Sequence, residues 1–285
     1  DDALRCEVEA LLAADARSTV TPLERPLQHL PGWMSEIRVP APLEAGARIG
    51  RFVVRRLLAV GGMGAVYEAE QLHPRRTVAL KLMRRGLTSR QAVRRFDHEC
   101  RTLARLHHPH VARIFDADVH DDGNGPAPWF AMEYIVDART IVEYAAGRGA
   151  GVRERIELIM QVCDAVEHGH QKGILHRDLK PGNVLVDDAG QVTVIDFGIA
   201  RTLEEDVDGT MHTRAGEILG TLSYMSPEQF GPDRHDIDVR GDVYGIGVML
   251  YELLCGRLPH DVTAASIFDA ARTVREETPI RPSLI

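Results

Sequence analysis

The hydrophobic residues of this chain change their spacing partway along the sequence. From Arg51 they gather in short runs typical of strands, separated by turn residues; the clearest are Phe52-Val53-Val54, Ala65-Val66-Tyr67-Glu68-Ala69 and Thr77-Val78-Ala79-Leu80-Lys81-Leu82. Beyond Thr140 the apolar residues recur at the helical period over several turns, in residues 153–171 and 242–254. Strand texture followed by helical texture predicts an α+β fold, with an antiparallel sheet in its first part.

Further elements are expected between these two textures. Apolar residues three or four apart predict a helix over residues 89–106; they are Val93, Phe96, Cys100, Leu103 and Leu106. Two more strands are predicted around Val111–Phe115 and Phe130–Tyr134, with the Gly, Asn and Pro residues of 121–128 forming a loop between them. His107, His108 and His110 flank a proline and have no carboxylate or cysteine at ligand spacing, so a turn is expected there rather than a metal site.

The first residues differ in character from the rest. Leu4, Val8, Leu11 and Leu12 recur at the spacing of one helix face, which predicts a short amphipathic helix over residues 3–17. Repeated prolines then favour a linker over residues 18–46, since each removes an amide donor. We therefore divide the chain into an N-terminal helix with a Pro-rich linker, 1–48, and a folded domain, 49–285.

Composition excludes several classes of protein. The net charge of −8 would repel a polyanion, so nucleic acid is not the expected partner. No apolar run approaches the roughly 20 residues that span a bilayer. The four scattered cysteines have neither zinc-ligand nor disulfide spacing, which suits a reducing compartment. Because the chain opens on Asp1 without a methionine or a signal-like segment, we expect a fragment of a longer protein.

Several motifs carry chemistry. A glycine-dense turn, Gly61-Gly62-Met63-Gly64, joins two strands, and such turns let backbone amides approach phosphate groups. Lys81 follows in an apolar strand and Glu99 on the next helix; a buried ammonium needs a carboxylate partner and suits phosphate oxygens. Taken singly, each has an ordinary reading as a hairpin, a surface lysine or a solvated glutamate. The later runs are His176-Arg177-Asp178-Leu179-Lys180-Pro181-Gly182-Asn183 and Val192-Thr193-Val194-Ile195-Asp196-Phe197-Gly198.

In this order and combination, these residues resemble the eukaryotic-type protein kinase family over about residues 49–284. The sequence around Ser226-Pro227-Glu228 is most similar to that of bacterial serine/threonine kinases. The predicted helix at 3–17 is similar to the segment that precedes the domain in large, repeat-bearing members. The resemblance implies a two-lobed kinase-like fold, with a sheet-rich N-lobe at 49–135 and a helical C-lobe at 136–285 that is incomplete at its C-terminal end.

The resemblance also implies a catalytic apparatus that uses ATP and Mg²⁺. Lys81 would hold the α- and β-phosphates, positioned by Glu99, while Asn183 and Asp196 would bind the metal. Asp178 would accept the proton of the acceptor hydroxyl and Lys180 would neutralise charge on the transferred group. The remaining nucleotide-binding residues that it implies are Ala59, Val60, Gly61, Gly62, Met63, Gly64, Val66, Ala79, Met132, Glu133, Ile135 and Leu185.

Specificity and regulation follow from the same resemblance. Lys180 and the Gly220-Thr221 pair look like the serine/threonine-specific branch, with Thr221 at the acceptor site. Arg177 is a cation that a phosphorylated residue could engage, and Thr210 and Thr213 are the candidate phosphosites, with ordinary polar loop residues as the alternative. The expected partners are protein substrates and, for trans-autophosphorylation, a second copy of the chain. Because the domain needs ATP, we expect it to face the cytoplasm.

Two departures from the family pattern bear on activity. Ala59 replaces the first glycine of the phosphate loop, which predicts a modest loss of nucleotide affinity. The family continues beyond Ile285 with helices that carry an arginine partner for Glu228, so we expect lower stability from the fragment. The alternative function is a pseudokinase that binds nucleotide or partners without turnover; the presence of Lys81, Asp178 and Asp196 favours the enzyme. A third reading places the relevant activity downstream of this chain.

Overall fold

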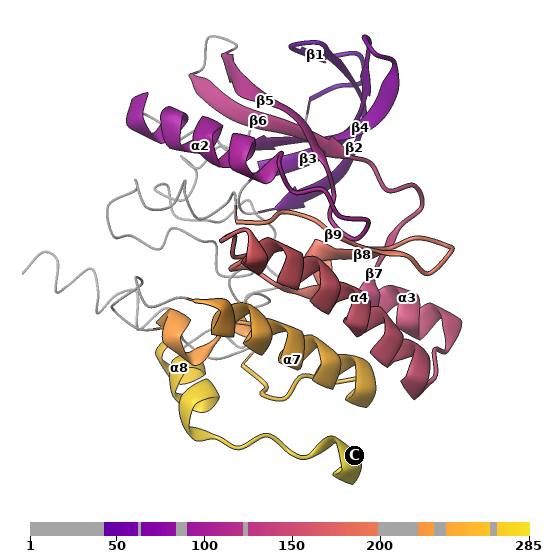
Figure 1. The fold of residues 1–285 in the computed structure, drawn as a ribbon, viewed down its shortest axis with the longest axis vertical. Helices are drawn as coiled ribbons and strands as arrows, with labels where there is room; N and C mark the ends of the chain where they lie inside the picture. Colours follow the sequence, from indigo (N-terminus) through magenta and orange to yellow (C-terminus); the bar gives the residue numbers. More distant parts are fainter. Residues whose placement is uncertain are drawn as a thin grey trace, which may run out of the picture. The chain divides into compact units, whose positions relative to one another are not determined.

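The computed structural model describes residues 43–61, 64–83, 90–121, 125–198, 222–230, 238–262 and 267–285, all within the compact unit Pro42–Ile285 (Figure 1). The expected helix at 3–17 and the linker up to residue 42 lie outside these ranges. Residues 43–46, which we predicted as linker, contact the sheet instead: the Leu43 N–H donates to the Tyr67 hydroxyl at 3.1 Å, and the Gly46 N–H donates to the Val54 carbonyl at 2.8 Å. The folded part therefore begins earlier than the sequence suggested.

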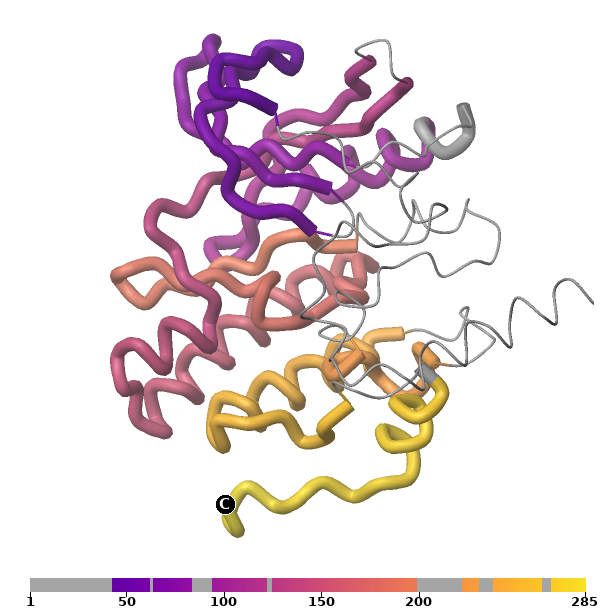
Figure 2. Tube along the Cα trace, turned by 180° about the vertical axis from the view of Figure 1, so that it is seen from behind, coloured from indigo at the N-terminus to yellow at the C-terminus, as the bar shows by residue number. Residues whose placement is uncertain are grey.

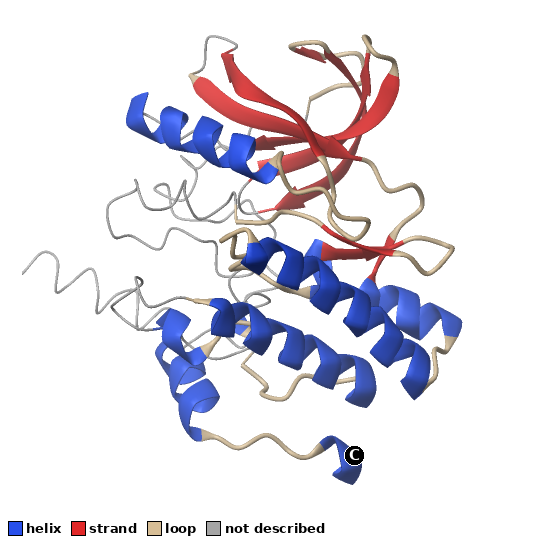
Figure 3. Ribbon diagram, in the orientation of Figure 1, coloured by secondary structure: helices blue, strands red, loops and turns tan. Residues whose placement is uncertain are grey.

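Six antiparallel strands form the first part of the fold, which confirms the predicted antiparallel sheet. Their order is β1-β2-β3-β4-β6-β5, with the bounds β1 Arg48–Ile49, β2 Phe52–Gly61, β3 Gly64–Gln71, β4 Arg76–Met83, β5 Ile114–Asp121 and β6 Pro126–Glu133. Figure 3 shows the strands gathered in one part of the molecule and most helices in the other, with the helix α2 (Arg90–Leu103) beside the sheet against β5 and β6.

The two hairpin partners β5 and β6 extend into the stretch that we predicted as a loop. Asp121 pairs with Pro126, and Val119 pairs with Pro128, so the loop prediction for 121–128 was wrong at both ends. The prolines are compatible with a strand here because β4 pairs with β6 only from Trp129 onward. At residues 126–128 strand β6 has a neighbour on one side, and a proline can turn its missing N–H to the open side. Likewise β5 begins at Ile114, while Val111 makes an isolated bridge to Val194.

The helical part contains α3 (Ile141–Arg148), α4 (Val152–Gln171), α7 (Val239–Cys255) and α8 (Ile267–Glu276). The chain enters it from β6 through one short segment (Figure 2). A second sheet of order β7-β8-β9 lies there, with β7 at Arg139–Thr140, β8 at Val184–Val186 and β9 at Val192–Val194. Short 3₁₀ helices occur at η4 (Pro181–Asn183), η5 (Pro227–Phe230) and η7 (Pro282–Leu284).

Capping fixes where the helices begin. Thr140 and Glu143 form a capping box that starts α3, and Asp238 caps α7 by accepting from the Arg240 N–H. The sequence predicted that α7 begins at Asp242, but the helix begins at Val239. Helix α2 ends at Leu103 rather than at the predicted Leu106. Leu106 is nevertheless buried, because the turn after α2 keeps its side chain in the core.

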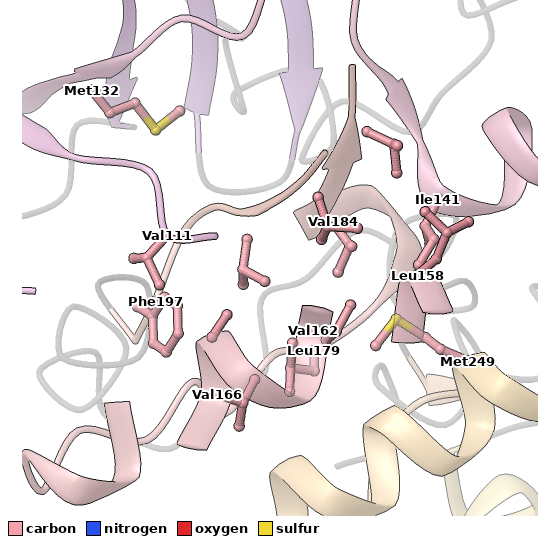
Figure 4. Close-up of a cluster of buried hydrophobic side chains, with 14 of the residues drawn as sticks. Val111, Met132, Ile141, Leu158, Val162, Val166, Leu179, Val184, Phe197 and Met249 are labelled. Atoms are coloured by element: carbon pink, nitrogen blue, oxygen red, sulfur yellow. The ribbon is translucent and has the colours of Figure 1, made fainter. Parts of the chain in front are cut away.

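One hydrophobic cluster joins the sheet to the helices. Figure 4 shows Val162 of α4 below Val184 of β8 and Val166 of α4 on the side of Phe197, with Met249 of α7 at the opposite end. Met132 of β6 belongs to the same cluster. The face of the six-stranded sheet that packs on the helical part therefore shares one core with it, and a separate cluster covers the opposite face.

Candidate active site

The strand register places four of the predicted nucleotide-site residues on one face of the sheet. Val66 of β3 is paired with Lys81 of β4, and Ala79 of β4 is paired with Met132 of β6. Directly paired residues of antiparallel strands point to the same face, as do residues two apart on one strand. This is the face that packs toward the core shared with the helices, since Ala79 and Met132 are buried in that core and Val66 packs against it.

The two described glycines of the phosphate-loop turn have different reasons to be glycine. Gly61 and Gly64 are paired where β2 and β3 meet, and Gly62 and Met63 lie outside the described residues. A Cβ on Gly64 would lie 2.1 Å from the carbonyl oxygen of Leu82, so the packing of β3 on β4 excludes any other residue. A Cβ on Gly61 would meet nothing closer than 4.0 Å. The fold does not require glycine at 61, which leaves close approach by a ligand as a physical reason for it.

Lys81 and Asp196 form a buried ion pair. Lys81 Nζ lies 2.5 Å from Asp196 Oδ2, and the two side chains are 11% and 14% exposed. The pair connects β4 to the segment after β9, so it connects the two parts of the fold. Among the described contacts Lys81 pairs with Asp196, and the support of Lys81 by Glu99 stays a prediction. Glu99 Oε1 lies close to Gly198, 3.2 Å from where a Cβ on that glycine would be.

Asp196 has a second oxygen with a different environment. Asp196 Oδ1 is buried and has no hydrogen-bond partner among the residues that the structure describes. A buried carboxylate oxygen without a partner is costly unless a cation or a donor completes it. Oxygen ligands are those that Mg²⁺ prefers. The Asn183 carbonyl oxygen accepts from the Ile195 N–H at 2.9 Å, which holds Asn183 beside the residue preceding Asp196. The chemistry of these two residues fits a bound Mg²⁺.

Asp178, Lys180 and Asn183 form one contacting group in the loop that precedes β8. Lys180 Nζ lies 2.9 Å from Asp178 Oδ2. Asn183 Nδ2 donates to the Asp178 carbonyl at 2.7 Å and to Asp178 Oδ2 at 3.1 Å. Since Asn183 uses its amide nitrogen for both bonds, its side-chain oxygen is the atom suited to a metal. The structure thus brings together the residues that the sequence proposed as the catalytic base, its neighbouring cation and a metal ligand.

Asp242 of α7 supports this loop, and sequence reasoning missed it. Its side chain is 2% exposed and accepts from the His176 N–H at 2.8 Å and the Arg177 N–H at 2.7 Å, and it contacts His170 Nε2 at 2.7 Å. Three partners satisfy the buried carboxylate. A signal was present in the sequence: Asp242 lies at helical spacing from the buried Gly245 and Met249, so it is an acid on the apolar face of its helix.

Other predicted residues receive less support from the described contacts. The Glu133 N–H already donates to the Arg113 carbonyl at 2.9 Å, so only the carbonyl of Glu133 could serve an adenine edge. Ile135 and Leu185 are half-buried, the latter on β8. Ala59 of β2 is paired with Val66 of β3, and the neighbouring Val60 is 52% exposed. The three threonines predicted as phosphosites or acceptor-site residue, Thr210, Thr213 and Thr221, lie outside the described ranges.

The fold and this site define a protein kinase. Residues 52–280 match the family model described as the protein kinase domain, and the chain belongs to that family. It is 37% identical over 235 residues to the serine/threonine-protein kinase PknB of Mycolicibacterium smegmatis, a match that covers 82% of this chain and 36% of PknB. It is also 36% identical over 238 residues to the serine/threonine-protein kinase PrkC of Bacillus subtilis, covering 82% and 35% of the two chains.

A solved structure agrees with this assignment. The PknI kinase domain of Mycobacterium tuberculosis superposes with a TM-score of 0.60 at 28% identity, covering 79% of this chain and 82% of that one. The chain spans only about a third of the length of the curated relatives quoted above.

Proposed function

We propose that this domain transfers the γ-phosphoryl group of ATP to serine or threonine hydroxyls of proteins. The observation that carries the proposal is the contact of Asp178 with both Lys180 and Asn183. The loop that contains Asp178 is held in place because the Asp242 side chain accepts a hydrogen bond from its backbone. A carboxylate near a cation and a metal-binding amide suits in-line transfer to a hydroxyl. The names of PknB and PrkC point to the same acceptor class.

The side chains divide the work. Asp178 accepts the hydroxyl proton and orients the acceptor oxygen, while Lys180 neutralises charge on the transferred group. Lys81 binds the α- and β-phosphates, at the same face of the sheet as Val66, Ala79 and Met132, which enclose the adenine. Glu99 supports Lys81 once the nucleotide is bound.

Asp196 and Asn183 are the residues that would hold Mg²⁺, through oxygen atoms. When bound, the metal supplies positive charge that offsets the charge of the phosphates. Gly61 leaves room for the phosphates at the hairpin end, and Leu185 closes the adenine site from β8. We place the boundary between the two lobes near residue 135, a division supported by the end of strand β6 at Glu133.

We propose further that the domain phosphorylates Thr210 or Thr213 on its own activation segment, with a second copy acting in trans, and that it works in bacterial signalling where ATP is present, on the cytoplasmic side. In the part of the chain that the structure describes, no helix has the length and apolar character needed to cross a bilayer.

The test compares the parent chain with an Asp178→Asn variant. Both are incubated with ATP, Mg²⁺ and a generic protein substrate, and phosphate is mapped by mass spectrometry. We expect phosphoserine or phosphothreonine with the parent. The rate of phosphate transfer should be at least about a thousandfold lower in the variant, because the substitution removes the proton-transfer group and its contacts. Nucleotide binding by both proteins, with turnover by neither, would support the pseudokinase instead.

A further inference from the structure

The side chain of Gln229 joins two segments that meet beneath the candidate active site. Gln229 belongs to η5 and is 8% exposed. Its Oε1 accepts from the Ser226 N–H at 2.8 Å and from the Ser226 hydroxyl at 3.3 Å. Its Nε2 donates to the Arg177 carbonyl at 3.0 Å, across 52 residues of sequence. One amide group therefore links the Ser226-Pro227-Glu228 turn to the residue that precedes Asp178.

The hydrogen bond from Gln229 to the Arg177 carbonyl restrains the peptide group between Arg177 and Asp178. The Arg177 carbonyl and the Asp178 N–H belong to one planar peptide unit, so fixing the oxygen restricts the orientation of the whole unit. At its other end, the Asp178 N–H donates to His176 Nδ1 at 3.3 Å. Gln229 and His176 thus hold the same plane from opposite edges.

The conformation of Arg177 needs such support. Its φ is +67°, in the left-handed region that a residue with a Cβ seldom adopts. Asp242 binds its N–H and Gln229 binds its carbonyl, so both backbone polar groups of the strained residue are held by side chains from outside the loop. Asp242 comes from α7 and Gln229 from η5, and the two supports are independent.

We propose that Gln229 is a positioning residue that sets the orientation of Asp178 through the Arg177–Asp178 peptide, and that it ties this orientation to the Ser226 turn. The inference rests on the proposed role of Asp178. It assigns to Gln229 no contact with the nucleotide or the metal. Its loss should therefore lower kcat and leave the KM for ATP unchanged.

Two substitutions separate the bond to Arg177 from the bonds to Ser226. Gln229→Met keeps the length of the side chain and removes all three bonds. Gln229→Glu keeps an oxygen for the Ser226 N–H and replaces the donor to the Arg177 carbonyl with a second oxygen, which repels it. If the Arg177 bond matters, both variants lose kcat, by about tenfold or more, as expected when one buried hydrogen bond is lost from a positioned base.

Gln161 of α4 provides a matched control. Its Oε1 accepts from the Val192 N–H at 2.9 Å and its Nε2 donates to the Gly190 carbonyl at 3.3 Å, the same two kinds of backbone bond made outside the catalytic loop. Gln161→Met should lower the melting temperature and retain the parental kcat. Amide hydrogen exchange of peptides covering residues 176–179 gives a readout independent of turnover, and it should be faster in both Gln229 variants and parental in Gln161→Met.

The outcomes are distinct. A parental kcat in folded Gln229→Met or Gln229→Glu would overturn the proposal, as would an equal loss of kcat in Gln161→Met. An Asp178→Asn variant as active as the parent would overturn the proposed role of Asp178, and this inference with it. Loss of kcat in both Gln229 variants, with an unchanged KM for ATP and faster exchange in 176–179, supports the positioning role.

Discussion

The buried pair between Lys81 and Asp196 allows a quantitative test of how the two parts of the fold are held together. Both side chains are less than one-sixth exposed, so solvent screens the pair weakly. Removing one partner leaves the other charge buried without compensation, whereas removing both leaves no charge to compensate. We therefore expect Lys81→Met and Asp196→Asn each to destabilise the protein and the double variant to be close to the parent.

The expected size follows from the burial of the pair. Loss of one partner of a buried pair costs about 3 kcal/mol at the lower end of the usual range, and the slight exposure of both groups favours that end. For a domain of this size, that corresponds to a melting temperature roughly 6–12 °C lower. The double variant should recover most of this, so the coupling in the thermodynamic cycle should exceed about 3 kcal/mol and approach the sum of the two single losses, about 6 kcal/mol.

The assay is thermal and urea unfolding of all four proteins without nucleotide, followed by circular dichroism. Equal slopes of free energy against urea concentration would show that the variants unfold over the same surface area. Purely additive losses, with the double variant as unstable as the sum of the singles, would refute the reasoning.

Two further predictions concern the hairpin glycines and a histidine cluster. Gly61→Ala should weaken ATP binding and leave the melting temperature unchanged, whereas Gly64→Ala should lower the melting temperature strongly because its Cβ meets the backbone of β4; equal stability of the two variants would contradict this. Burial, with His168 and His110 nearby, lowers the pKa of His108 below its usual 6.5. The unfolded chain then takes up the proton first, so this contribution to stability is complete above about pH 6.5 and is lost as pH falls through the lowered pKa. His108→Gln should therefore lose less stability than the parent between pH 7 and 5 in urea titrations, and parallel losses would argue against it.

The comparison of sequence with structure separates local from distant information. The strands at β2, β3 and β4 and the helices α4 and α7 were predictable, because periodicity and turn residues are properties of neighbouring residues. The sequence prediction for 126–128 was wrong because a proline cannot donate to the ladder of a strand that has neighbours on both sides, so prolines normally indicate a loop. Only the sheet order shows that β6 has one neighbour there.

The same distinction holds at the site. Asp178, Asn183 and Asp196 could be named from motifs, since each lies in a short run of characteristic residues. The ion pair between Lys81 and Asp196 could not be named in this way, because it depends on how β4 and the segment after β9 lie in space.

Local patterns along the chain were enough to indicate the family and the order of its elements, and to predict the residues that we propose carry the chemistry. The tertiary structure alone decided that Asp242 supports the backbone before Asp178, that Gln229 holds the same peptide from η5, and that Lys81 pairs with Asp196. Each of these joins residues far apart in sequence, and such contacts depend on the packing of whole elements, which no local pattern specifies.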